Sequence, residues 1–432
     1  MQTYQLGTTT IDITPPVGIF LSGFAARTEP STGAYHPLRA VISIITDGQT
    51  RACLVSVEWL GFYDRCEEAR ERIAGATGID TSHIFLFGTH THYGPAVRRG
   101  IDGRRKCFVD EEYVARSLDA ISQAAVTALE KMERVLLSGG RGWCGFAASR
   151  RMPDGNGSVA WVPTLDAPHD HEVPVITAKS EAGELRQLLF SYACHPTRGG
   201  GGINEIGGDY PGFAMEHLDA AFSGCSPLFL LGCAGDQKPN VSYSDKPGFR
   251  PLEVEETKDL GDRLGEAVVH VVESDDLCPI NGALKINQQV LDLKFAAVDD
   301  QTVQQSLQSS NKYIRAWAEH LASLKEQELP WPESIPFEVQ TLVIGNSLAL
   351  ITFSAEVTVE YALRLKRELG SRFENVIVLG YANHIIGYVP VKRQIPEGGY
   401  EVIGSNQHML YPGPFAADTE EQICAAVHEC LA

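Results

Sequence analysis

The sequence lacks the features that recruit nucleic acid or a lipid bilayer. Its 432 residues include 36 Lys and Arg against 55 Asp and Glu, which gives a net charge of −19, and no basic residues gather into a block. Such a chain repels phosphate groups, so nucleic acid and anionic membrane surfaces are excluded as partners. No apolar run approaches the roughly 18 residues that a transmembrane helix needs. We therefore expect no membrane span.

Targeting signals and a disulfide framework are also missing. The first residues, MQTYQLGTTTIDITPPVG, contain no basic stretch followed by an apolar run, which a signal peptide would require. We therefore expect a soluble, cytoplasmic protein. The ten cysteines form no CxxC pair, and most lie within apolar runs. In a chain of this size we expect them to be buried, reduced thiols.

Short apolar runs alternate with amphipathic helical patterns along most of the chain. Two β-type runs flank Asp47-Gly48, helical patterns cover 66–78 and 110–133, and a polar helix is expected near 300–328. This alternation predicts an α/β or α+β fold with mixed β-sheets, flanking helices and an active site at strand ends. We expect a single domain over 1–432, with a candidate subdomain boundary in the Pro-rich stretch 328–338.

Three of the expected strands end in residues that can bind a metal. The stretch FLFGTHTHYGP places His90 and His92 one residue apart, SYACHPT presents His195, and LLGCAGDQKPN presents Asp236. Residues i and i+2 of a strand point to the same face, so the first two histidines would project together. Taken alone, each histidine is equally explained as a hydrogen-bonded loop residue. Their recurrence at strand ends favours one site at the edge of a sheet.

Zinc suits two imidazoles and a carboxylate best, because neutral imidazole is a borderline-soft ligand. Water bound to zinc ionises near neutral pH and can attack a carbonyl. Other metal-hydrolase patterns fit less well. The sequence has no HExxH motif, HTHYG lacks the Asp of the metallo-β-lactamase pattern, and eight regular strand–helix units of an amidohydrolase barrel are not found.

An ordered series of motifs extends this interpretation. The pieces TTTIDITPPVGIFLSGFAAR, GTHTHYGP, SYACHPT, GDYPG, LLGCAGDQKPN, FSAE and GYANHIIGYVPVKRQIPEGGYE run from residue 8 to about 402. Together and in this order they resemble the motifs of the neutral/alkaline non-lysosomal ceramidase family, in its N-terminal catalytic domain. Each piece is short, and the specificity lies in the order. The resemblance implies zinc-dependent hydrolysis of an amide.

The resemblance also implies roles for individual residues. It implies four metal ligands: His90, His195, Glu356 and Tyr388. Tyr400 would help to bind the reacting carbonyl, His92 would carry a proton or contact the substrate, and the family's active-site arginine corresponds to Arg150 or Arg151. Without the resemblance, Glu356 would be a hairpin carboxylate, and the two tyrosines would be rim residues. Asp236 has a similar alternative, because Asp often caps a turn.

The sequence departs from the family in two places. Lys238 stands in GDQKPN where the family has a serine, and only about thirty residues follow Tyr400, so the C-terminal immunoglobulin-like domain of the family is not expected. We therefore predict a small, soluble and anionic substrate instead of a membrane sphingolipid. Arg150 or Arg151 would grip its carboxylate, and Lys238 would add a second cationic contact.

The resulting hypothesis is a zinc-dependent hydrolase that cleaves an amide of a small molecule by attack of zinc-bound water. Three alternatives stay open: a ceramidase-like lipid amide hydrolase, an ester or lactone hydrolase, and a non-catalytic protein with a structural zinc. The absence of clustered basic residues argues against a phosphate substrate. Loop lengths do not encode the substrate or the oligomeric state, so a homo-oligomer is left open.

Overall fold

A nine-stranded mixed sheet organises the chain in the computed structural model, which describes all residues except 1, 100–108, 156–157, 201 and 275. Its strands follow the order β12 (Ser226–Leu231), β10 (Leu185–Tyr192), β9 (Glu172–Ser180), β6 (Glu133–Trp143), β1 (Thr3–Asp12), β3 (Arg39–Thr46), β4 (Arg51–Val57) and β5 (Ile84–Gly88), with β14 (Cys278–Ile280) beside β6. The pairs β10–β12 and β4–β5 are parallel, and the others are antiparallel. The α/β prediction with mixed sheets is confirmed.

A second sheet lies against the first. It contains β15 (Leu284–Lys294), β16 (Ser334–Ile344), β17 (Leu348–Phe353) and β19 (Asn375–Leu379). Phe85 and Phe87 of the first sheet share one buried cluster with Leu342 and Leu350 of the second. Part of the Pro-rich stretch 328–338 belongs to β16, where Glu338 forms a buried ion pair with Arg70. This shared core supports the proposal of a single domain.

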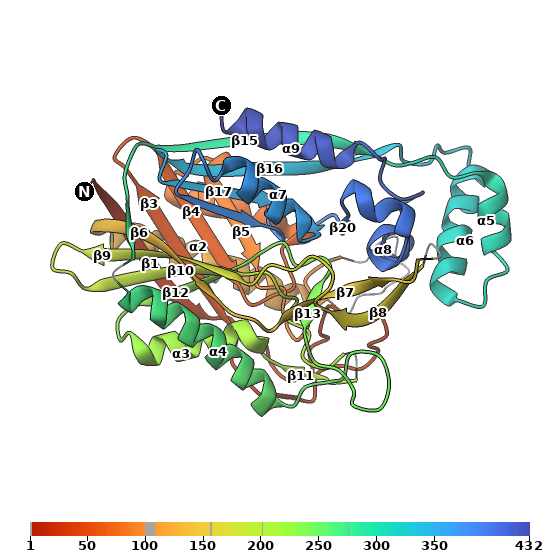
Figure 1. Cartoon of the computed structure of the whole chain (residues 1–432), viewed down its shortest axis with the longest axis horizontal. Helices are drawn as coiled ribbons and strands as arrows, with labels where there is room; N and C mark the ends of the chain where they lie inside the picture. The colour runs from red at the N-terminus through yellow and green to blue at the C-terminus, as the bar shows by residue number, and fades with distance from the viewer. Residues whose placement is uncertain (1, 100–108, 156–157, 201, 275) are drawn as a thin grey trace.

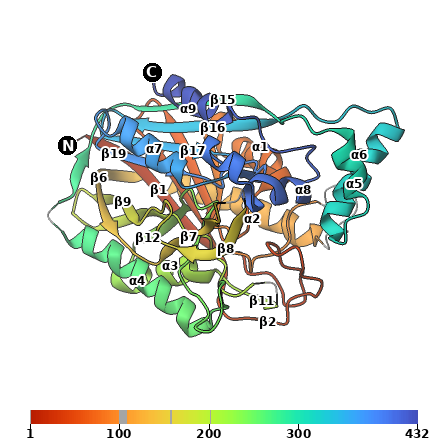
Figure 2. The ribbon, with the colours of Figure 1, turned by 45° about the vertical axis from the view of Figure 1, so that its right-hand side comes forward.

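Three pairs of helices cover the sheets (Figures 1 and 2). They are α1 (Cys66–Thr77) with α2 (Glu111–Glu130), α3 (Asp209–Ala221) with α4 (Val254–Glu273), and α7 (Glu360–Leu369) with α9 (Thr419–Cys430). Along β4, Val55 faces the first pair and Leu54 faces the second sheet. Burial of both faces explains why these strands are continuous apolar runs in the sequence.

Short elements complete the structure around the site. They are β2 (Gly33–Ala34) with β11 (Glu205–Ile206), β13 (Gln237–Pro239) with β7 (Ala147–Pro153) and β8 (Val159–Thr164), β18 (Glu356–Val357) with β20 (Tyr388–Val389), and α8 (Ser405–His408). No helix in the described part of the chain is both long and apolar enough to cross a bilayer.

The sequence-based helices are largely confirmed. Residues 66–77 form α1, which ends at Gly78 with a left-handed φ of 72°. The single helix expected near 300–328 is wrong: α5 (Asp300–Ser306) and α6 (Lys312–Glu326) replace it. The Asn311 side chain accepts a hydrogen bond from the backbone N–H of Tyr313, so it caps a new helix instead of continuing the old one.

The cysteines follow the expectation of buried thiols. Seven of the nine described cysteines are buried, and these nine are free thiols. Cys107 lies outside the described residues.

The carboxyl ends of strands from both sheets come together at one place. Ser56 Oγ of β4 donates to Phe229 O of β12 at 2.7 Å, although these strands are far apart in the sheet order. Isolated bridges join Phe87 to Ala382 and Gly232 to Leu379. The loops that follow β5, β12 and β19 are therefore neighbours.

Candidate metal centre and active site

His90 and His92 lie in the loop after β5, which ends at Gly88. They follow the strand end, as expected, but the strand alternation that was expected to align them does not extend to residues 90–92. His90 has a left-handed φ of 65°, and its backbone N–H donates to Trp59 O at 2.9 Å. This turn, and not strand alternation, directs the two imidazoles. Their ring centroids lie 5.1 Å apart.

His195 follows β10 and is fully buried. Its Nδ1 lies 2.6 Å from Ala234 O, and Nδ1 of His90 lies 2.7 Å from Leu60 O. A carbonyl oxygen only accepts hydrogen bonds, so both Nδ1 atoms carry the proton. The Nε2 atom of each ring is therefore left with a free lone pair. Metal-ligating histidines are held in this way by a partner of their second nitrogen.

Glu356 and Tyr388 are placed side by side by a short parallel pairing. Strand β18 lies beside β20, with Glu356 directly opposite Tyr388. The backbone N–H of Glu356 donates to Gly387 O at 2.8 Å. A Cβ at Gly235 would collide with the carbonyl oxygens of Glu356 and Val357. Only glycine allows the loop that follows β12 to approach β18 this closely.

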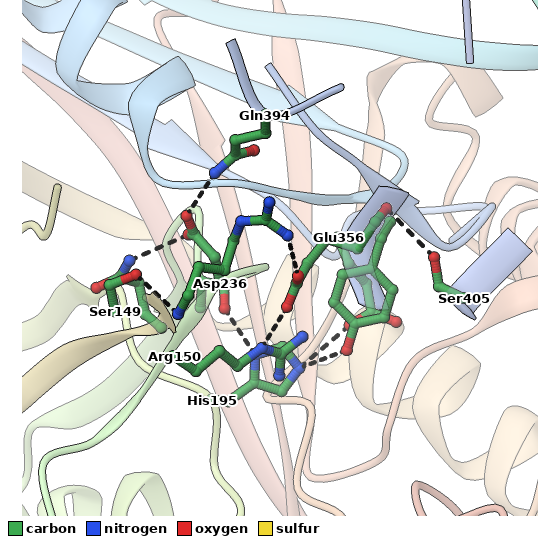
Figure 3. A network of polar contacts seen from close by, with 12 residues as sticks. Ser149, Arg150, His195, Asp236, Glu356, Gln394 and Ser405 are labelled. Carbon is green, nitrogen blue, oxygen red and sulfur yellow. Dashed lines mark hydrogen bonds and ion pairs between the residues drawn. The ribbon is translucent and has the colours of Figure 1, made fainter. Parts of the chain in front are cut away.

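These four side chains converge, and Figure 3 shows two of them, His195 and Glu356, side by side. Oε2 of Glu356 lies 3.2 Å from Nε2 of His90 and 3.1 Å from Nε2 of His195. The Tyr388 hydroxyl lies 3.1 Å from the same Nε2 of His195. Ligand atoms bound tetrahedrally at about 2.0–2.1 Å from zinc are separated by about 3.3 Å. The spacing and the donor set of two imidazoles, a carboxylate and a phenol fit zinc.

The electrostatics of the centre agree with this fit. Burial, partly offset by the neighbouring Glu356 carboxylate, lowers the pKa of His195 to about 4, so its imidazole is neutral at neutral pH. Burial alone would raise the pKa of Glu356, but His90 and His195 hold it well below its usual value. Neutral imidazole and ionised carboxylate are the protonation states that bind a cation.

His92 differs from the other two histidines. Both of its ring nitrogens are buried and have no hydrogen-bond partner among the residues that the structure describes. Burial first, and then His90 and His195, hold the pKa of His92 well below its usual value. Ligand atoms of the three histidines lie within 4.8 Å of one another, so they form a candidate metal-binding group of their own. His92 lacks the anchoring hydrogen bond of a ligand, which favours a role beside the metal.

Arg150 and Arg151 share Glu401 as a partner and differ in their other contacts. Arg151 donates to Glu401 at 2.6 Å, to Glu397 at 3.1 Å and to Gly398 O at 2.9 Å. Arg150 donates from Nε to Glu401 at 2.7 Å, and its guanidinium lies 5.1 Å from the ring centroid of Tyr388. Arg150 therefore faces the four-residue centre, and Arg151 belongs to an ion-pair cluster behind it.

The remaining candidates surround the centre. The ring centroid of Tyr400 lies 5.3 Å from that of Tyr388. Lys238 lies on β13 with its Nζ 4.8 Å from the ring centroid of Phe249. Asp236 is buried and accepts hydrogen bonds from Val359 N at 2.9 Å and Gln394 Nε2 at 3.0 Å. These contacts match its alternative interpretation as a capping residue.

Sequence reasoning missed two residues that support the site. The Tyr381 ring lies 4.4 Å from that of His90, and its hydroxyl lies 3.4 Å from Nδ1 of His195. Tyr381 belongs to the same GYANHIIGYVP motif as Tyr388, which was the available signal. Glu401 binds both arginines, and its position directly after Tyr400 was the only sign of it.

Comparison with known proteins identifies the fold. No protein-family model matches the sequence, and no curated protein matches it significantly. A solved structure described as "Ceramidase complexed with C2" matches with a TM-score of 0.77 and 17% identity, over 100% of this chain and 75% of that one. Neutral ceramidase from Pseudomonas aeruginosa matches with a TM-score of 0.75 and 16% identity. This match covers 100% of this chain and 74% of that one. The chain has a neutral ceramidase-like fold, which the ordered motifs predicted.

Proposed function

We propose that this protein is a zinc-dependent hydrolase that cleaves an amide bond in a small molecule. The observation that carries the proposal is that Oε2 of Glu356 lies within 3.2 Å of both His90 Nε2 and His195 Nε2. The neutral ceramidase-like fold supports an amide as the bond.

His90, His195, Glu356 and Tyr388 would hold the zinc. When bound, zinc supplies a Lewis acid that polarises the carbonyl and activates water at neutral pH. The chain's contribution is to fix these donors, through Leu60 O and Ala234 O behind the two imidazoles. Mutation of such supporting contacts typically lowers metal affinity.

His92 is the proton carrier in this proposal. Its imidazole is neutral because burial and the neighbouring histidines keep its pKa low, and both nitrogens are without partners. One ring nitrogen therefore accepts a proton from the attacking water and returns it to the leaving amine nitrogen. Tyr400, beside Tyr388, donates a hydrogen bond to the oxygen on which negative charge develops.

A lipid amide is the second candidate substrate. The two structural neighbours are described as ceramidases, and Met152, Trp161 and Ile403 are exposed apolar side chains on or next to elements that carry the site. An N-acylsphingosine with a long chain and a water-soluble N-acetyl amide therefore form the decisive pair of substrates.

The first experiment measures zinc and amide hydrolysis in the same preparation. Protein purified without chelators should contain about one zinc per chain, lose activity on chelation and recover it when zinc is added. Faster release of amine from the soluble amide than from the long-chain lipid would support the small substrate, and the reverse order would support the lipid. A chain that binds no zinc, or that keeps its activity after chelation, would refute the proposal.

A further inference from the structure

Lys238 and Arg150 project from neighbouring strands to the same side. Strand β13 pairs with β7 in antiparallel register, with Lys238 opposite Ala148. Residues directly opposite in such a pair share a face, and so does the residue two positions along. Arg150 is that residue, because it lies two positions after Ala148 on β7. The positive charge of Arg150 adds to the burial that lowers the pKa of Lys238 to about 8.

Lys238 has no polar partner among the residues that the structure describes. Its one charge-related contact is with the Phe249 ring, at 4.8 Å from Nζ to the centroid. The Asp209 carboxylate acts on Lys238 only by charge, raising its pKa, and its oxygens accept the backbone N–H groups of Arg198 at 2.8 Å and Tyr210 at 2.6 Å. The Lys238 side chain is half-buried, and an ammonium group that is partly withdrawn from water without a counter-ion is costly unless something neutralises it.

Arg150 also has an unused donor. Glu401 binds its Nε, but its Nη2 is buried and has no hydrogen-bond partner in the described part of the chain. The guanidinium is held in place by aromatic rings, with its central carbon 4.4 Å from the ring centroid of Trp161 and 5.1 Å from that of Tyr388. The guanidinium that carries this donor therefore lies beside Tyr388, a proposed metal ligand.

We propose that Lys238 and Arg150 form a carboxylate-binding subsite, and that the substrate is an amide carrying a carboxylate close to the scissile bond. One carboxylate oxygen would accept from Nη2 of Arg150 and the other from Nζ of Lys238. The net charge of −19 gives the surface no general attraction for anions, so recognition depends on these two groups. Lys238 is a specificity residue in this scheme and takes no part in bond cleavage.

This inference rests on the proposed function, since the metal centre defines where the scissile bond lies. It is nevertheless testable without turnover. Benzoate and its neutral analogue benzamide differ in charge and little in shape. Titration calorimetry of the zinc-loaded chain should detect benzoate binding and no benzamide binding. Lys238→Gln should weaken benzoate binding about tenfold or more, the effect of one charge-assisted contact, and Lys238→Arg should restore most of it.

Two controls locate the binding site. Lys246 also stacks on an aromatic ring, 4.1 Å from the centroid of Tyr243, but it is exposed, so Lys246→Gln should leave the affinity for benzoate unchanged. His195→Ala separates this subsite from anion binding by the metal. If benzoate fails to bind, binds equally to Lys238→Gln, or is lost only in His195→Ala, the carboxylate subsite is refuted.

Turnover then distinguishes the two proposals. We expect an N-acetyl amino acid to be cleaved with a higher kcat/KM than its neutral carboxamide, and Lys238→Gln should raise KM for the acid alone. Zinc-dependent cleavage of both compounds without preference would overturn the subsite and leave the hydrolase intact. A chain without zinc that still binds benzoate through Lys238 would overturn the hydrolase and leave the subsite.

Discussion

The metal-ligand half and the substrate-facing half of the centre differ in how their buried polar atoms are satisfied. In the first half, Nδ1 of His90 and Nδ1 of His195 each donate to a backbone carbonyl. In the second half, both nitrogens of His92 and Nη2 of Arg150 are buried and have no hydrogen-bond partner among the described residues. An unsatisfied buried polar atom costs about 1–3 kcal/mol. The difference indicates that the protein fixes the metal ligands itself and leaves the other half for the substrate to complete.

Removing a ligand should have the largest effect. In His195→Ala we expect zinc content to fall well below one per chain and amide hydrolysis to drop by about 10³-fold or more, because the Lewis acid is lost. Elemental analysis and amine release measure the two effects. His83→Ala is the matched control. Nδ1 of His83 also lies close to a backbone carbonyl oxygen, that of Arg51 at 3.1 Å, but His83 is away from the centre. Full zinc content and activity in His195→Ala would show that His195 is not a metal ligand, and the comparison between the two halves would fail.

His92 should give the next largest effect, with a different signature. We expect His92→Gln to lower kcat by about 10²–10⁴-fold, the usual contribution of a general acid–base residue, while zinc content stays near that of the native chain. Zinc content and kcat must be measured on the same samples. Loss of zinc equal to that in His195→Ala would assign His92 to the ligands, as in the group of three histidines, and would break the comparison.

The ligand half shows what the sequence could predict. The histidines were found from their recurrence after apolar runs, and the strands that carry them are present. The physical reason given for His90 and His92 was nevertheless wrong, because the turn at His90, with φ of 65°, lies beyond the strand. Glu356 and Tyr388 came only from the family resemblance. Their pairing in β18 and β20 is a long-range contact, which local patterns do not encode.

The substrate-facing half was less predictable for a related reason. The sequence could not say which of Arg150 and Arg151 faces the centre, since neighbouring strand residues point to opposite sides. Their assignment depends on long-range contacts: Arg150 lies beside Tyr388, whereas Arg151 donates to Glu397 and Gly398 O. The break between α5 and α6 was not predicted either. It depends on one capping residue, Asn311, within a sequence pattern that is helical on both sides.

Glu58 tests whether a buried polar atom without a hydrogen-bond partner lowers the stability of the fold at a place where no ligand is expected to supply that partner. Its Oε2 accepts Arg39 N at 2.6 Å, but its Oε1 has no partner. Burial, partly offset by Arg39, raises the pKa of Glu58 from 4.5 to about 7. The folded state therefore favours the protonated form. This contribution to stability is fully present below about pH 4.5 and is lost as the pH rises through about 7.

The magnitude for Glu58 is on the order of 3 kcal/mol between pH 4.5 and 8. Denaturant unfolding of the native chain and of Glu58→Gln should show a fall in unfolding free energy over this range that is larger in the native chain by this amount. Other titrating groups, including Asp209, are common to both proteins and cancel in the difference. If the unfolding free energies of the two proteins changed equally with pH, Glu58 would be ionised or solvated in the folded state. Its unpartnered oxygen would then carry no cost, contrary to the comparison.

The smallest expected effect concerns the loop that covers His92. Gly23 has a φ of 97°, and a Cβ there would collide with the His92 ring. In Gly23→Ala we expect the ring to shift and kcat to fall about tenfold, since a small misplacement of a catalytic group is costly. Gly18→Ala is the matched control: its φ is 102°, but an added Cβ has no atom within 4 Å. Both variants should lose about 1–2 kcal/mol of unfolding free energy from the left-handed backbone. Only Gly23→Ala should lose activity, and equal activities would mean that the position of His92 does not matter for the reaction.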